Sequence, residues 1–173
     1  SPFIIIYNKT LFDQAGIPTP SELAAKGEWT WDKFREVSKK LKEKTGIFGF
    51  QTVDAAGYNS RVWHNLVPII RGYGGAVWDN NGNALINRKE SVEAVQLFHD
   101  MVYVDKSVVP PGDLSDFYAG NAAMTVGQIS RVSKLKDVSW EWDVAVLPQG
   151  PAGVNRSYTI GQAAVVAFSS GKN

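Results

Sequence analysis

The two histidines are the first candidates for metal chemistry, but their spacing does not favour a metal site. His64 and His99 lie in separate helical patterns, and neither is followed by a second ligand four residues later. Cysteine is absent, which excludes disulfides, thiolate nucleophiles and cysteine-ligated metals. We therefore predict a protein without a bound metal or cofactor.

A nucleophile or a phosphate loop is not favoured either. Serine, histidine and aspartate all occur, but no Gly-x-Ser-x-Gly motif places a serine for attack. The glycine-rich stretch at 72–75 follows a helical pattern instead of a strand and lacks the Lys-Ser/Thr pair of a phosphate loop. It is typical of a helix end followed by a tight turn.

Paired carboxylates are the remaining catalytic option, because two acids flanking a glycosidic bond can hydrolyse it. The available acids occupy turn, cap or strand-edge contexts, where aspartate is common for structural reasons. They are Asp54, Asp79, Asp113, Asp116 and Asp143. A carbohydrate-active enzyme domain that uses such a pair stays open as an alternative, and loss of glycoside turnover on changing Asp54 or Asp116 would support it.

Aromatic side chains are the most informative class, with six Trp, six Tyr and eight Phe. Trp31, Phe34 and Phe98 fall on apolar helix faces and are predicted to be core. Others lie at helix starts, loops or strand edges, where a ring can stack on a sugar while its polar edge forms hydrogen bonds. These are Tyr58, Trp63, Tyr73, Trp78, Tyr118, Trp140, Trp142 and Tyr158.

The composition is that of an ordinary globular domain of 173 residues, with 44% hydrophobic and 20% charged residues. The net charge of +1 indicates neither nucleic acid nor an anionic membrane as a partner. No apolar run approaches the roughly 20 residues of a spanning helix, so direct membrane insertion is not predicted.

Strand patterns recur along the chain and alternate with helical ones. The apolar run at 3–7 indicates a strand covered on both faces. Further strands are predicted at 47–53, 122–127, 142–147 and 158–168, with a small hairpin over 76–86.

Helices are predicted at 8–15, from Thr30 to a stop at Gly46, from Asn59 or Ser60 onward, from 87 to about 105, and at 128–136. The segment 17–20 is expected to be an extended connection, because each proline restricts the residue before it. Pro68 is expected to kink the third helix or end it early.

The helix at 87–105 is predicted in more detail. Asn87 and Glu90 are expected to form a capping box. The buried side chains are expected to be Val92, Val95, Leu97 or Phe98, and Val102. Alternating helices and strands predict a single α/β domain with a parallel or mixed sheet.

The order of these pieces resembles a known family. The resemblance is carried by YNKTLFDQAGIPTP, then GEWTWDKFREVSKKL, GGAVWDNNGNALIN, RKESVEAVQLFHDMV, FYAGNAAMTVGQ and WDVAVLPQGPAG. They are similar to the middle of bacterial extracellular solute-binding proteins of ABC importers, in the sugar-binding group related to maltose-binding protein. Tyr7-Asn8-Lys9 and Thr30-Trp31 match that family well, whereas Asn121 stands where the family usually has Lys.

The resemblance implies a periplasmic-binding-protein type II lobe with a mixed sheet flanked by helices. Such proteins have two lobes that clamp a ligand between them. Residues 1–173 would be one domain, the second lobe taken from hinge to hinge, with hinge strands at 1–7 and 157–161. The first lobe and the C-terminal helices would lie outside it.

The resemblance also implies which residues contact the ligand. They lie at the start of the helix near 58–63, after the Ala-Met strand, and at the second hinge. Carried over to this sequence they are Tyr58, Asn59, Arg61, Trp63, Gly127, Gln128, Arg131, Ser157 and Tyr158. Maltose-type members have an aromatic where this chain has Gln128-Ile129, so hydrogen bonding by Gln128 is expected there, with stacking by Tyr58, Trp63 or Tyr158.

The implied function is reversible, non-covalent capture of a sugar or oligosaccharide and its delivery to the membrane subunits of an ABC permease. The protein would not be an enzyme, and it would act in the periplasm or outside the cell, with lipid anchoring of the parent protein as one option. Besides the enzyme alternative, the ligand-sensing domain of a transcription regulator stays open, because it shares this fold.

Overall fold

The computed structural model describes residues 2–52, 58, 62–151, 158 and 160. The predicted start of a helix at Asn59 or Ser60 and most of the predicted strand at 158–168 lie outside these residues. The elements in chain order are β1 (Phe3–Asn8), α1 (Lys9–Ala15), α2 (Pro20–Ala25), α3 (Trp31–Thr45), β2 (Phe48–Gln51), α4 (Trp63–Gly72), α5 (Lys89–Tyr103), β3 (Ala122–Gln128), the 3-10 helix η1 (Ile129–Leu135) and β4 (Trp142–Ala145).

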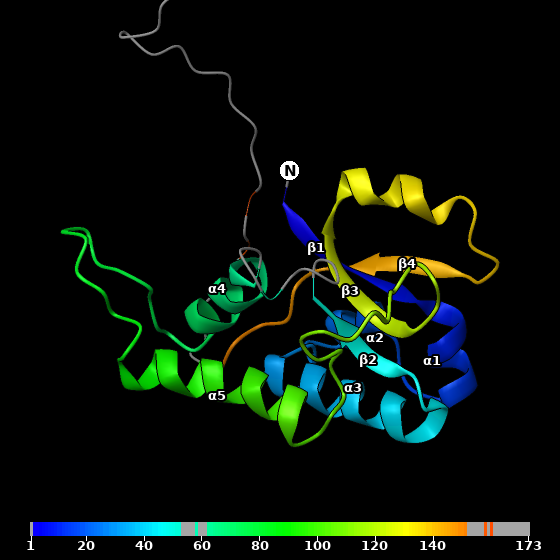
Figure 1. Ribbon diagram of the computed structural model, residues 1–173, viewed down its shortest axis with the longest axis horizontal. Coiled ribbons are helices and arrows are strands. Elements are labelled where there is room, and N and C mark those ends of the chain that lie inside the picture. The colour runs from blue at the N-terminus through cyan, green and yellow to red at the C-terminus, as the bar shows by residue number, and fades with distance from the viewer. Residues whose placement is uncertain (1, 53–57, 59–61, 152–157, 159, 161–173) are drawn as a thin grey trace, which may run out of the picture.

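The four strands form one mixed sheet in the order β2-β3-β1-β4 (Figure 1). β1 is antiparallel to both of its neighbours, whereas β2 and β3 are parallel. The apolar sequence of β1 fits its place inside the sheet, because its side chains enter a hydrophobic core on each face. The predicted α/β architecture, a mixed sheet flanked by helices, is confirmed.

Successive residues of β1 point to opposite faces of the sheet and so enter two different cores. Ile5 belongs to the larger core, which packs against α3, α4 and α5 on the side where Figure 1 shows α3 and α5. Ile6 belongs to a smaller core with Phe117 and Leu135, beneath η1. Both isoleucines are almost fully buried, so the central strand holds the two layers together.

The connection after β1 is more helical than the sequence indicated. Pro20, expected in an extended connection, is the first residue of α2. Thr19 is extended, as expected, but its hydroxyl accepts from the Glu22 backbone N–H at 3.3 Å, and the Glu22 carboxylate accepts from the Thr19 N–H at 2.7 Å. This capping box, with proline at the first helical position, starts a helix directly after the restricted residues.

α3 has the predicted bounds and the predicted buried face. The Thr30 hydroxyl accepts from the Lys33 N–H at 3.2 Å, and Gly46 ends the helix in the left-handed region at φ 74°. The side chains of Trp31, Phe34, Val37 and Leu41 are buried.

α5 buries Leu97, Phe98 and Val102 as predicted, but its first turn differs from the prediction. Its N-cap is Arg88, without a side-chain cap, so the predicted capping box of Asn87 and Glu90 is wrong. Val92 is 51% exposed, whereas Ser91 is buried and donates to the carbonyl oxygens of Ala76 and Leu85. Because those two hydrogen bonds turn Ser91 inward, the adjacent Val92 points to solvent.

Two other local predictions differ from the structure. Pro68 does not end its helix early, since α4 continues to Gly72, so of the two expected effects only the kink stays a prediction. The segment at 76–86 contains the turn but no regular strands: Trp78 and Ala84 form an isolated bridge, and the Asp79 carboxylate accepts from the backbone of Asn81 and Asn83. Local hydrogen bonds of the aspartate thus organise the turn without a ladder.

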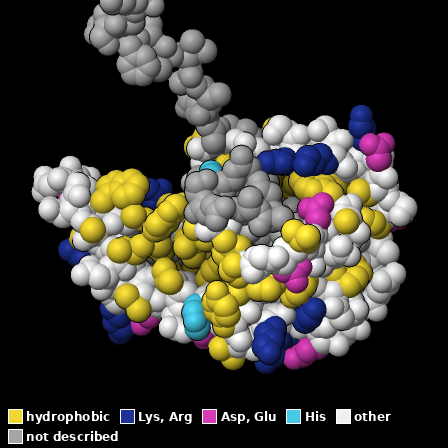
Figure 2. All heavy atoms as spheres, in the orientation of Figure 1, with side chains coloured by type: hydrophobic (Ala, Val, Ile, Leu, Met, Phe, Trp, Pro, Cys, Tyr) yellow, Lys and Arg dark blue, Asp and Glu magenta, His cyan; other side chains and the backbone are white. Residues whose placement is uncertain are grey.

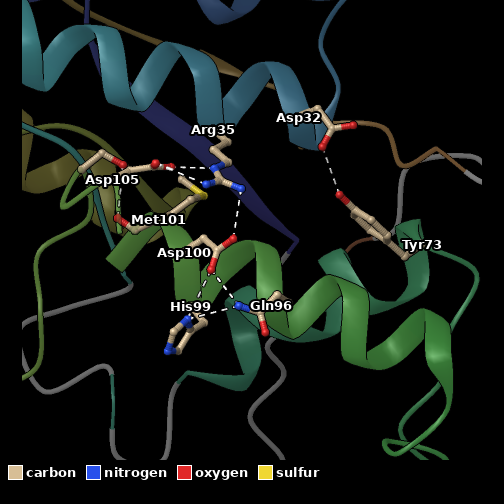
Figure 3. Close-up of polar contacts among 9 residues, drawn as sticks. Asp32, Arg35, Tyr73, Gln96, His99, Asp100, Met101 and Asp105 are labelled. Atoms are coloured by element: carbon tan, nitrogen blue, oxygen red, sulfur yellow. Dashed lines mark hydrogen bonds and ion pairs between the residues drawn. The ribbon is translucent and has the colours of Figure 1, made fainter. Parts of the chain in front are cut away.

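An ion-pair network joins α3 to the end of α5 (Figure 3). Arg35 Nε donates to Asp105 at 2.6 Å and Nη2 donates to the same carboxylate at 3.2 Å, while Nη1 reaches Asp100 at 3.3 Å. These hydrogen bonds to Asp105 raise the pKa of Arg35. The Tyr73 hydroxyl donates to Asp32 of α3 at 3.2 Å. Helices α3, α4 and α5 are therefore connected by polar contacts as well as by their core.

Candidate functional site

One end of the sheet brings together several of the predicted ligand contacts. Phe3 at the start of β1 pairs with Gln128 at the end of β3. The Phe3 ring also lies beside the His64 ring, with centroids 4.6 Å apart, so the first turn of α4 reaches the same place. We call this the entry end of the sheet, defined by Phe3, Trp63, His64, Gln128 and Arg131.

Gly127 allows the chain to pack closely at the entry end. A Cβ atom on this residue would lie 3.3 Å from Ile6 Cδ1 and 3.4 Å from Arg131 Cγ. The aliphatic part of Arg131 therefore lies over Gly127, which keeps the guanidinium close to the strand end. Gln128 and Arg131 are polar groups of the kind that bind sugar hydroxyls.

Trp63 is the first residue of α4, and 42% of it is exposed. A tryptophan at the start of a helix beside polar groups can present one ring face to a ligand. Its position at the helix start and its partial exposure are compatible with the predicted stacking role.

The two predicted tyrosines have different settings. The Tyr58 hydroxyl donates to the carbonyl oxygen of Val109 at 2.6 Å, and its ring lies beside Phe98 with centroids 6.4 Å apart. Burial raises the pKa of Tyr58, so this hydroxyl stays protonated and remains a donor. Tyr158 is half-buried and packs against the larger core. Of the two, Tyr58 has its hydroxyl hydrogen-bonded within the chain itself.

The remaining predicted contacts are Asn59, Arg61 and Ser157, and they lie outside the described residues. Further along the chain, Ile160 forms an isolated antiparallel β-bridge with Pro2. The two passages of the chain, around residues 2–3 and around residue 160, therefore lie side by side next to the entry end.

Sequence reasoning did not select His64 as a ligand contact. The structure adds it to the candidates because its ring stacks on Phe3 and follows Trp63 directly. Its position next to a tryptophan at a helix start was the signal available in the sequence. Among the described residues, no group of three or more histidines, cysteines or acids is arranged to hold a metal ion.

Three of the five aspartates considered for glycoside hydrolysis have carboxylates hydrogen-bonded within the described structure, and Asp116 accepts from the Ala119 and Asn121 N–H groups through its backbone carbonyl. Asp113 accepts from the Ser115 backbone N–H at 2.7 Å, and hydrogen bonding by the Ser115 side chain, followed by this N–H, lowers the pKa of Asp113. Asp143 accepts from the Tyr7 hydroxyl at 3.1 Å. Asp79 organises its turn, and its pKa is lowered chiefly by Asn83. Asp54 lies outside the described residues.

Exposed apolar surface is not confined to the entry end. In Figure 2 hydrophobic side chains also gather over the α4–α5 side of the face in view. Trp78, Tyr103 and Val104 are each more than half exposed. Exposure alone therefore does not distinguish the candidate site, which is chosen because the strand ends and α4 meet there. None of the helices within the described ranges has the length and apolarity needed to span a bilayer.

Comparison with known proteins gives a consistent result. The chain is 25% identical over 170 residues to an arabinooligosaccharide-binding protein of Halalkalibacterium halodurans, covering 91% of this chain and 36% of that protein. It is 26% identical to a putative binding protein of Brucella abortus, of which it covers 40%. The chain thus spans about two fifths of the length of these relatives.

Solved structures agree with this fold. A maltose-bound MalE3 of T. maritima matches with a TM-score of 0.73 at 25% identity, covering 91% of this chain and 41% of that one. A substrate-binding protein of Listeria monocytogenes in complex with cycloalternan matches at 0.68 and 27%, covering 87% and 38%. The periplasmic-binding-protein architecture implied by the sequence is therefore confirmed. The profile of the bacterial extracellular solute-binding proteins matches residues 1–173, and this chain belongs to that family.

Proposed function

We propose that this chain is one lobe of the substrate-binding component of an ABC importer, which captures a sugar or oligosaccharide non-covalently and delivers it to a membrane permease. The observation that carries the proposal is the meeting of Trp63, Gln128 and Arg131 at the entry end, in a chain whose whole length matches the family. The relatives with sugars in their names or complexes support the ligand class.

The lobe would work as half of a clamp. We propose that residues 1–7 and 157–161 are the two crossings to a second lobe; the pairing of Pro2 with Ile160 supports this, because it puts the two passages together. Closure of the second lobe over the entry end would enclose the ligand, and the closed form would be the one that the permease recognises. The parent protein would act in the periplasm or outside the cell.

Recognition would divide between stacking and hydrogen bonding. Trp63 would cover one face of a sugar ring, at roughly 25 cal/mol per Å² of apolar area removed from water. Gln128 and Arg131 would select hydroxyl groups, because a buried polar group left unpaired costs about 1–3 kcal/mol. No covalent step is involved.

The test compares the 173-residue chain with the full-length parent by calorimetry, using maltose, laminaribiose and arabino-oligosaccharides as probes. We expect measurable affinity for one of these sugars in the full-length protein, and at least tenfold weaker binding by the single lobe. Equal affinity of the two proteins would contradict the two-lobe clamp. Failure of every sugar with a folded full-length protein would contradict the ligand class.

A further inference from the structure

Two buried glycines that lie far apart in the sequence contact each other through their backbones. Gly72 is the last residue of α4, and Gly150 lies in the stretch that we call the post-β4 segment, defined by residues 146–150. A Cβ atom on Gly150 would overlap the carbonyl group and the Cα atom of Gly72, which are backbone atoms and cannot rotate away. No side chain therefore fits at position 150 between this segment and the end of α4.

Neither glycine is required by its own backbone conformation. Both have a φ outside the left-handed region, where a side chain would be strained. Gly72 is helical, and a helix favours alanine over glycine by up to about 1 kcal/mol. A Cβ atom on Gly72 would lie 2.9 Å from Trp31 Nε1 and 3.2 Å from Gly150 Cα, whereas carbon atoms in contact are usually about 3.5–4.0 Å apart. The close approach, and not local propensity, explains glycine at both positions.

The post-β4 segment is fixed to the start of α3 just before it reaches Gly72. The Gln149 N–H donates to the Trp29 carbonyl oxygen at 2.9 Å, and the Gln149 carbonyl oxygen accepts from the Trp31 N–H at 3.0 Å. The Trp29 indole N–H also donates to the Val146 carbonyl oxygen at 2.9 Å. Because these hydrogen bonds hold the segment, a side chain between the two glycines would displace α4.

We propose that Gly72 and Gly150 are positioning residues, whose contact sets the place of α4 and thereby of Trp63 at the other end of this helix. α4 is ten residues long, from Trp63 to Gly72, so a shift at its last turn is carried to its first residue. The effect on sugar affinity rests on the proposed function, because Trp63 is there proposed to stack on the sugar. The effect on the position of α4 does not.

The test measures two quantities in the full-length parent carrying Gly72→Ala: the resonance of the Trp63 indole N–H without ligand, and the affinity for the sugar that the wild type binds. The resonance is identified by its loss in Trp63→Phe. We expect it to move, because the displaced helix changes the surroundings of the ring. Sugar binding should weaken roughly tenfold, since binding groups must be held within about 0.5 Å of their productive position. Gly150→Ala should change both quantities more strongly.

Gly46→Ala is the matched control. Gly46 has a φ of 74°, and no atom lies within 4 Å of the place its Cβ would take, so alanine there strains the backbone without displacing another element. This variant should lower the free energy of unfolding and leave both the Trp63 resonance and the affinity unchanged.

An unchanged Trp63 resonance in Gly72→Ala, or an equal change in Gly46→Ala, would overturn the proposal. A moved resonance with wild-type affinity would overturn its link to binding. If the wild type binds none of the sugars, the proposed function fails, and the resonance alone decides whether the glycines position α4. If Gly150→Ala does not fold, Gly72→Ala decides, because the helix propensity of alanine supports its folding.

Discussion

The two ends of β1 use their side chains in opposite ways. At the end we call the cap end, defined by Asn8, Lys9, Glu141 and Trp142, the polar groups form hydrogen bonds and ion pairs within the chain itself. The Asn8 side chain caps α1 by accepting from the Leu11 N–H at 3.1 Å, and Lys9 pairs with Glu141 at 2.9 Å. At the entry end, the start of β1 meets a strand end and the first residues of a helix.

We interpret this difference as one between polar groups that stabilise the fold and polar groups that are proposed to bind a ligand. A group that caps a helix or closes an ion pair has its hydrogen bonds fixed by neighbours in sequence or in the sheet. The entry end instead combines a partly exposed tryptophan, an amide and a guanidinium at a place where three segments converge. The comparison predicts that changes at the cap end alter stability and that changes at the entry end alter binding.

The largest effect is expected from removing the ring of Trp63. In the full-length protein Trp63→Ala should weaken sugar binding by about 2 kcal/mol, or roughly 30-fold, because a stacked aromatic anchor is lost. Trp142→Ala is the matched control: Trp142 is 37% exposed, pairs with Asn8 at the cap end, and should leave the affinity unchanged. Calorimetry on both variants measures this, and equal losses would remove the distinction between the two ends.

A smaller effect of the opposite kind is expected at Asn8. Asn8→Ala removes the side-chain cap of α1 and should lower the free energy of unfolding by about 1 kcal/mol. Chemical denaturation measures this loss, and Asn8→Asp should retain most of the stability because aspartate also caps. A drop in sugar affinity without a change in stability would place Asn8 in the binding machinery instead.

The smallest effect concerns how the free energy of unfolding depends on pH through the capping box of α2. Hydrogen bonds from Thr19 lower the pKa of Glu22 in the capping box of α2. A carboxylate with a lowered folded-state pKa contributes stability above its unfolded pKa of about 4.3, and that contribution is lost as the pH falls through the folded value. Between neutral and acid pH, the free energy of unfolding of Glu22→Gln should therefore fall slightly less steeply than that of the wild type. Superimposable pH profiles for the two proteins would mean that the Glu22 carboxylate adds nothing.

Local signals predicted much of this fold. Thr30 and Gly46 bound α3 as expected, since a threonine cap and a left-handed glycine act through their own neighbours. The strand at 3–7 and the strand at 122–127 were both predicted from short apolar runs. Residues 128–136 were predicted to be helical, and the structure has the 3-10 helix η1 there.

Predictions that depended on distant partners were less successful. The buried face of α5 was wrong at Val92, because hydrogen bonds from Ser91 to Ala76 and Leu85 rotate the helix start. α2 is an exception, because its signal is local: Thr19 and Glu22 form a capping box with Pro20 at the first helical position, where an extended connection is expected from the prolines. His64 was set aside as a non-metal histidine, and only its contact with Phe3 brings it to the entry end.

The sequence by itself determined most of the helix and strand segments, the α/β class and the family, because caps, apolar periodicity and motif order act over a few residues at a time. Tertiary structure alone decided that β1 lies between β3 and β4, and that Phe3, Gln128 and the start of α4 meet at one end. Strand order and register depend on hydrogen bonds between residues far apart in the chain, which no local pattern specifies. The candidate site is composed of such contacts, and so it became visible only when the sheet was assembled.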